Sequence, residues 1–149
     1  GPGHLAILGI DDLFYRHIAL LLKPNLFLNE LSADARYISS GSRIIDAVCD
    51  VARDIGRKPL TMTDMENISG ATARNLQYHF KKRFGCSPME WQRQERLKSA
   101  RLILKTSETA SIKELSIRLG FSSPSNFILY YRRMFGETPA ETRKNSGAG

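Results

Sequence analysis

The sequence has few of the residues on which metal centres, disulfide frameworks and membrane spans depend. It contains two cysteines and three histidines, and Cys49 and Cys86 lie 37 residues apart with no other cysteine or histidine at metal-ligand spacing. The longest apolar run, Ile18 to Leu22, has only five residues, whereas a membrane span needs roughly 18. These shortages argue against a zinc site, a disulfide framework and a membrane protein. They predict reduced thiols in the cytoplasm, with no metal and no cofactor.

Sustained alternation of apolar and polar residues, which marks half-buried strands, is also missing, and there is no Asn-Gly hairpin turn. Apolar residues make up 42% of the chain and charged residues 25%, which is the balance of a globular protein with a core. The apolar spacing is helical, so we expect an all-α fold. Residues 1–9 resemble an expression tag and residues 145–149 a flexible tail, and neither is expected in the fold.

Two helices are expected in the first third of the chain. The first begins at Asp11 or Asp12 as an N-cap and ends before Pro24, and it carries a wide apolar stripe. Residues 25–41 have the composition of a connector. A second helix is expected from Ser42 through Ile55, with Gly56 as the residue that closes it.

Four further helix starts share one pattern. A serine or threonine hydroxyl can cap the third amide of the helix, while an acidic residue three positions on reaches back to the amide of the cap. In two of the starts, proline at the first helical position adds support, because its missing N–H costs nothing there. The four pairs are Thr61/Asp64, Ser87/Glu90, Ser111/Glu114 and Thr138/Glu141.

These starts expose an internal repeat. Residues 65–70 align with residues 115–120 at a spacing of 50, and residues 80–88 align with residues 131–139 at a spacing of 51, so the second copy has one extra residue in its turn. Each copy has a short helix, a turn with a glycine, and a longer helix ending in Phe-Gly. That order is typical of a helix-turn-helix, although a duplicated αα-hairpin without a ligand has the same pattern.

Charge is distributed unevenly along the chain. Residues 1–56 hold five basic and seven acidic side chains, a net charge of −2, whereas residues 57–149 hold 17 basic and eight acidic ones, a net charge of +9. The basic part therefore coincides with the repeat. This indicates a polyanionic partner, although a basic face that serves only solubility gives the same count.

The longer helix of the first copy has two distinct faces. Its apolar stripe, which includes Leu76 and Phe80, is assigned to the core. The opposite face carries groups that can pair with base edges in the major groove, and others that can hold phosphates. The predicted base-reading residues are Arg74, Gln77 and Tyr78, and the predicted phosphate contacts are Thr72, Lys81 and Lys82.

Residues 42–144 resemble the DNA-binding domain of the AraC/XylS family. The residues that carry the resemblance are Gly85-Cys-Ser-Pro88, Arg96-Leu97, Ala100-Arg-Leu-Ile-Leu104, Ser111-Ile112, Leu119-Gly-Phe121 and Phe135-Gly-Glu-Thr-Pro139. The resemblance implies seven helices in two helix-turn-helix lobes, at about 61–85 and 111–136, joined by a linker helix over 88–105. The recognition helices 72–84 and 124–135 are then expected to enter successive major grooves. Arg96 and the apolar residues of the linker helix are expected to be structural.

The same resemblance implies a bacterial transcription regulator with double-stranded DNA as its partner. Residues 12–28 look like the segment that joins a sensor domain to this domain in some members, so residues 10–38 are expected to be a helical linker to a sensor that this chain does not contain. RNA polymerase is a further expected partner, and the full-length protein is a candidate dimer.

The second copy departs from the family pattern on its recognition helix. Shifting the outward face by 51 residues places Ser125, Ile128 and Leu129 at the base-reading positions, two of them apolar. Apolar side chains can touch thymine methyl groups but cannot bond to base edges. Thr142 also stands where members usually carry tyrosine, so the last helix is expected to pack differently. The predicted phosphate contacts here are Ser122, Ser123, Asn126, Arg132 and Arg133.

An enzyme finds little support in the sequence. His4, His17 and His79 are scattered, with no nucleophile or paired carboxylates at useful spacing. A DNA-repair methyl acceptor needs an activated cysteine, yet Cys49 falls on an apolar helix and Cys86 on a turn. The alternative to DNA binding is a helical protein-interaction module that uses Ile128, Leu129 and the stripe of residues 12–28, with an incidental basic surface.

Overall fold

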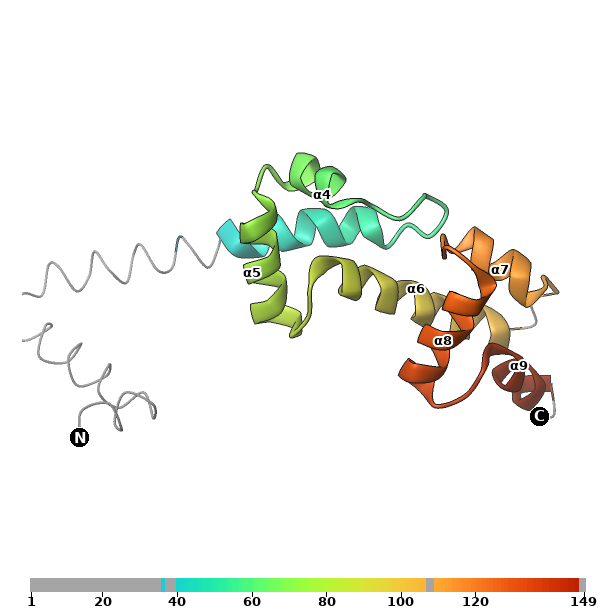
Figure 1. Ribbon diagram of the computed structural model, residues 1–149. Helices are drawn as coiled ribbons and strands as arrows, with labels where there is room; N and C mark the ends of the chain where they lie inside the picture. The colour runs from blue at the N-terminus through green and yellow to red at the C-terminus, as the bar shows by residue number, and fades with distance from the viewer. Residues whose placement is uncertain (1–35, 37–39, 107–108, 148–149) are drawn as a thin grey trace, which may run out of the picture. The chain divides into compact units, whose positions relative to one another are not determined.

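The computed structural model describes residue 36, residues 40–106 and residues 109–147 (Figure 1). The expected helix before Pro24 and the expected sensor linker lie outside the described residues. The chain divides into two compact units between Ser42 and Arg43. The second unit, Arg43–Gly149, carries both copies of the repeat.

Every regular element among these residues is helical, which confirms the all-α prediction. A helix over residues 40–52 comes first. Figure 1 labels the six that follow: α4 (Met62–Ser69), α5 (Ala73–Phe84), α6 (Pro88–Lys105), α7 (Ile112–Arg118), α8 (Pro124–Phe135) and α9 (Pro139–Gly147).

The first of these helices differs from its prediction at both ends. Residues 40 and 41 are already helical, so Ser42 does not open it, and the helix ends at residue 52 rather than at Ile55. The chain then turns where the Asp54 carboxylate accepts a bond from the Gly56 N–H at 3.0 Å. Gly56 is not among the glycines with positive φ, so it does not act as a left-handed cap. The turn frees Ile55 to pack elsewhere, against the core that contains Leu97.

Local chemistry sets the starts of the other helices. The reciprocal capping box is closed at Thr61, Ser111 and Thr138. At Ser87 only half of it forms in the described structure, where the serine hydroxyl accepts from the Glu90 N–H at 3.2 Å. Proline occupies the first helical position of α6, α8 and α9, where no backbone donor is required.

The seven helices surround two separate cores. Lobe one consists of the helix over residues 40–52 with α4 and α5, and lobe two consists of α7, α8 and α9. Between them runs α6, which packs against α5 in lobe one and against α8 and α9 in lobe two. Its Trp91 belongs to the first core, and Leu97, Ala100 and Leu104 belong to the second. This confirms the expectation that the apolar residues of the linker helix are structural.

Candidate nucleic-acid interface

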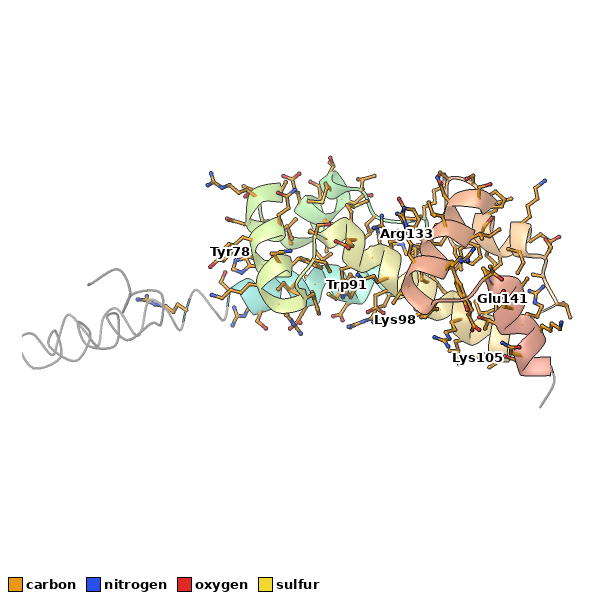
Figure 2. All side chains as sticks on the ribbon, turned by 60° about the horizontal axis from the view of Figure 1, so that its bottom comes forward. Tyr78, Trp91, Lys98, Lys105, Arg133 and Glu141 are labelled. Atoms are coloured by element: carbon orange, nitrogen blue, oxygen red, sulfur yellow. The ribbon has the colours of Figure 1, made fainter. Side chains whose placement is uncertain are left out.

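The buried face of α5 determines which side chains it exposes. Leu76 and Phe80 are completely buried, and the Phe80 ring lies 5.7 Å from the Trp91 ring in an edge arrangement. The opposite face is open to solvent, and Tyr78 is 48% exposed there. Figure 2 shows Tyr78 pointing outward while Trp91 lies inside lobe one. The structure also places on this open face the other predicted contacts of lobe one, Thr72, Arg74, Gln77, Lys81 and Lys82.

Three of the predicted phosphate contacts on α5 already have partners inside the protein. The Lys81 ammonium donates to the Gly85 carbonyl at 3.0 Å, and the Lys82 ammonium lies 5.7 Å from the centre of the Tyr78 ring. The Thr72 hydroxyl accepts from the Asn75 N–H at 3.2 Å as the helix cap. Because its oxygen accepts in that bond, its own hydrogen can still be donated to a phosphate oxygen.

The helix α8 repeats the arrangement of α5 at a distance of 51 residues. Phe127 and Tyr131 are completely buried and correspond to Leu76 and Phe80. Both helices end at a glycine in the left-handed region, Gly85 with φ of 76° and Gly136 with φ of 75°, where a side chain would be strained. The 51-residue register is therefore correct, and the residues it places outward on α8 are solvent-exposed.

The outward face of α8 is less polar than that of α5. Ile128 is 37% exposed and Leu129 is 44% exposed, and Ser125, Arg132 and Arg133 are exposed beside them. Leu129 is therefore not a core residue. This face offers two cations for phosphates but no polar group at its two central positions.

Polar side chains at the start of α8 bond to one another. The Ser123 hydroxyl caps the helix by accepting from the Asn126 N–H at 3.1 Å, and the Asn126 amide donates to the Ser122 hydroxyl at 2.6 Å. Each serine oxygen accepts in its bond, so each hydroxyl hydrogen remains available to an acceptor such as a phosphate.

Comparison with known proteins agrees with this geometry. The family model described as "Helix-turn-helix domain" matches residues 66–145, more than half of the chain, and covers both recognition helices. A curated relative, the "HTH-type transcriptional regulator GlxA" of Rhizobium meliloti, is 35% identical over 91 residues. A solved AraC-type regulator from Chromobacterium violaceum has a TM-score of 0.66 at 27% identity and covers 72% of this chain and 96% of its own. The chain belongs to the AraC family of helix-turn-helix transcriptional regulators.

The alignment with GlxA covers 61% of this chain but only 28% of that relative, so the chain spans less than a third of its length. The DNA-binding domain of AdpA, solved in complex with a target DNA, has the same fold, with a TM-score of 0.64 at 24% identity over 71% of this chain and 94% of that domain. The homologues of this chain are transcriptional regulators with helix-turn-helix DNA-binding domains.

His79 and Gln92 are among the polar residues of this AraC-type domain that were not identified from the sequence as buried. His79 on α5 is 8% exposed and lies edge-on to the Tyr78 ring at 5.2 Å. Its position three residues after Leu76 is a periodic signal that places it beside the apolar stripe. Gln92 is 2% exposed, and its amide bonds to both the N–H and the carbonyl of Leu60. Contacts of that kind leave no periodic signal.

The thiols of this AraC-type domain are poor nucleophiles. Burial raises the pKa of Cys49 to about 11 and also raises the pKa of Cys86. A nucleophilic cysteine requires the opposite shift, so neither is an activated methyl acceptor. Within the described ranges, no group of three metal-ligating side chains is found, and no helix is long and apolar enough to cross a membrane.

Proposed function

We propose that the domain binds double-stranded DNA sequence-specifically, with α5 and α8 entering successive major grooves. The observation that carries the proposal is the pair of exposed, register-equivalent helices at opposite halves of α6. That helix has 18 residues, so it is about 27 Å long at 1.5 Å per residue. With the width of the lobes added, this suits the roughly 34 Å between successive major grooves on one side of the duplex.

The two recognition helices have different tasks under this proposal. Arg74, Gln77 and Tyr78 read base edges in lobe one, since Arg matches guanine and Gln matches adenine. In lobe two Ser125, Ile128 and Leu129 face the groove, where the apolar pair can touch thymine methyl groups. The phosphate contacts are assigned to Thr72, Lys81, Lys82, Ser122, Ser123, Asn126, Arg132 and Arg133.

Two further observations support DNA as the partner. Residues 57–149 carry a net charge of +9, which favours a polyanion. The AdpA domain of the same fold was solved on a target DNA. As a regulator, the protein is then placed in the cytoplasm, with RNA polymerase, a sensor domain and a second subunit as candidate partners of the full-length protein.

Selection from a random duplex pool, followed by hydroxyl-radical footprinting, tests this function. We expect one selected sequence, with protected backbone on one side of the duplex across two adjacent major grooves. The control is a shuffled duplex of the same composition at the same salt concentration, which should bind more weakly. Equal affinity for both duplexes, or protection confined to one groove, would contradict the proposal.

A protein-interaction module is the second candidate, and the exposure of Ile128 and Leu129 favours it. In that case the selection yields no enriched sequence. Instead, Leu129→Ser weakens the association with a protein partner, and DNA competes with that partner only at low salt.

A further inference from the structure

The loop that precedes α4 contacts lobe two as well as lobe one. We call residues 57–60 the strap. In sequence the strap belongs to lobe one, because Thr61 is the cap of α4. In space it lies against the turn of lobe two, where a Cβ placed on Gly120 would lie 2.4 Å from the ring of Pro59. Ile55, just before the strap, also packs against the core of lobe two.

Two buried side chains of α6 hold the strap. The Arg96 guanidinium, 3% exposed, donates from one nitrogen to the Arg57 carbonyl and from another to the Leu119 carbonyl, both at 3.0 Å. It thus joins the strap directly to the turn of lobe two. One turn earlier on α6, the Gln92 amide accepts from the Leu60 N–H at 2.7 Å and donates to the Leu60 carbonyl at 3.0 Å. The side-chain amide of Gln92 and the backbone of Leu60 thus form two hydrogen bonds in opposite directions.

The glycine of lobe one that corresponds to Gly120 has no close neighbour of this kind. Gly70 takes the place of Gly120 in the repeat and has nearly the same backbone, with φ of 70° against 80°. A Cβ on Gly70 would meet nothing within 4 Å. The close approach at Gly120 therefore belongs to the contact between the lobes and is not a general requirement of this turn.

We propose that the strap, held by Arg96 and Gln92 and seated against Gly120, fixes the spacing and angle between α5 and α8. A single helix such as α6 lets the lobes bend and twist about its axis, whereas a second connection restricts both motions. Arg96, Gln92 and Pro59 are then positioning residues: they touch no DNA but determine which separation of half-sites the domain accepts. This inference rests on the proposed DNA binding, and its first test does not require DNA.

The first test measures the distance between the lobes in the free protein. Spin labels are attached to cysteines introduced at the exposed Asn75 and Met134, since Cys49 and Cys86 are buried. The parent should give one narrow distance distribution. Gly120→Ala should broaden or shift it, because the new methyl group meets Pro59, and Gly70→Ala, which has the same backbone strain but no neighbour, should not. Pro59→Ala should also broaden it, since the ring that seats the strap is removed.

The second test measures affinity for the selected site with one base pair inserted between its halves. The insertion moves one half by about 3.4 Å and turns it by about 35°. The parent should lose about tenfold or more in affinity, as for loss of a base contact. Pro59→Ala and Arg96→Met should lose much less on insertion, while retaining parent-like binding to a duplex that carries the lobe-one half alone.

Unchanged distance distributions in both Pro59→Ala and Gly120→Ala would overturn the proposal, and so would an unchanged penalty for the insertion in Pro59→Ala. Arg96→Met removes a buried cation and can unfold the domain. Pro59→Ala, a truncation at a half-buried site, therefore decides the outcome in that case. If the parent binds no DNA at all, the proposed function fails, and the distance measurement still decides whether the strap holds the lobes.

Discussion

The arginine side chains of this domain differ in burial and therefore in role. Arg74 is exposed on α5, and its guanidinium carries five hydrogen-bond donors. Arg96 is buried, donates to two backbone carbonyls, and has its pKa lowered by burial. The cost of burying Arg96 is offset only while both carbonyls accept, so this residue belongs to the structure of the domain. Arg74 has no such structural task and is available to a ligand.

The first prediction concerns Arg74 and Gln77. Arg74→Ala or Gln77→Ala should cost about 1 to 3 kcal/mol on the selected site and little on shuffled DNA, because a bidentate contact to a base is lost. Fluorescence anisotropy titrations on both duplexes measure the two costs. Arg83→Ala on the same helix is the control, since Arg83 is paired with Asp46 at 2.8 Å, and it should not alter base preference. Equal losses on both duplexes would move Arg74 and Gln77 to the phosphate contacts.

The second prediction concerns Thr142, which is 1% exposed on α9. Its hydroxyl lies 2.7 Å from the Tyr131 hydroxyl and 2.6 Å from the Glu137 carboxylate. Thr142→Val keeps the shape but leaves the buried Tyr131 hydroxyl without this partner, so it should lower the free energy of unfolding by about 1 to 3 kcal/mol.

Urea unfolding of Thr142→Val, Tyr131→Phe and the double variant measures this bond. The double variant should lose less than the sum of the single losses, because both partners are then absent. Additive losses would show that the hydroxyl pair contributes nothing of its own.

At the scale of the element, most helix bounds could be predicted because their signals are local. A cap, a proline at the first position and a closing glycine act within four residues. Ser87 and Pro88 begin α6 as this chemistry indicates, and Gly85 and Gly136 close α5 and α8. The helix over residues 40–52 was predicted to end three residues later, because Ile55 continues the apolar period. Its partner is the core of lobe two, and no local pattern reveals so distant a contact.

The candidate site could also be predicted only where its signals are local. The exposed faces of α5 and α8 follow from the helical period and the repeat. The contacts that join the lobes do not: Arg96 reaches partners 23 and 39 residues away, and Gln92 reaches one 32 residues away. Such contacts depend on how the helices pack, which the periodicity of one segment does not determine.

The third prediction follows from the apolar face of α8. Since Ile128 and Leu129 cannot form hydrogen bonds, substitutions under lobe one should cost about 1 to 3 kcal/mol per base pair, and those under lobe two should cost less. A base-by-base substitution scan of the selected site measures both halves. Strong penalties of equal size in the two halves would contradict this inequality.

Leu129→Arg should then add a guanine preference under lobe two, because the guanidinium matches the two acceptors of guanine. The substitution should be tolerated, since Leu129 is 44% exposed. Leu102→Arg on α6 is the control: Leu102 is 64% exposed but lies on neither recognition helix, so its replacement should add no guanine preference. A guanine preference in both variants, or in neither, would show that Leu129 does not face the groove.

At the scale of the whole domain, charge and shape act together. The net charge of +9 belongs to residues 57–149, which include the strap, both copies of the repeat and α6. A basic surface alone binds DNA independently of its sequence. Two recognition helices held at one separation add contacts to base edges, and these contacts make binding depend on the sequence. Affinity should therefore depend strongly on salt, and sequence preference should depend on it much less.

The last prediction gives this dependence a magnitude. If about six to eight phosphates are contacted, the logarithm of the binding constant should fall with the logarithm of the salt concentration at a slope of about −5 to −7. Lys81→Ala or Arg132→Ala should reduce the steepness by about 1 without changing the preferred sequence, because each removes one phosphate contact. Lys105→Ala, an exposed lysine at the end of α6, is the control and should leave the slope unchanged. Titrations of the selected duplex at four or more salt concentrations measure the slope for the parent and for each variant. A parent slope shallower than about −2 would mean that too few phosphates are contacted for both lobes to lie on the DNA.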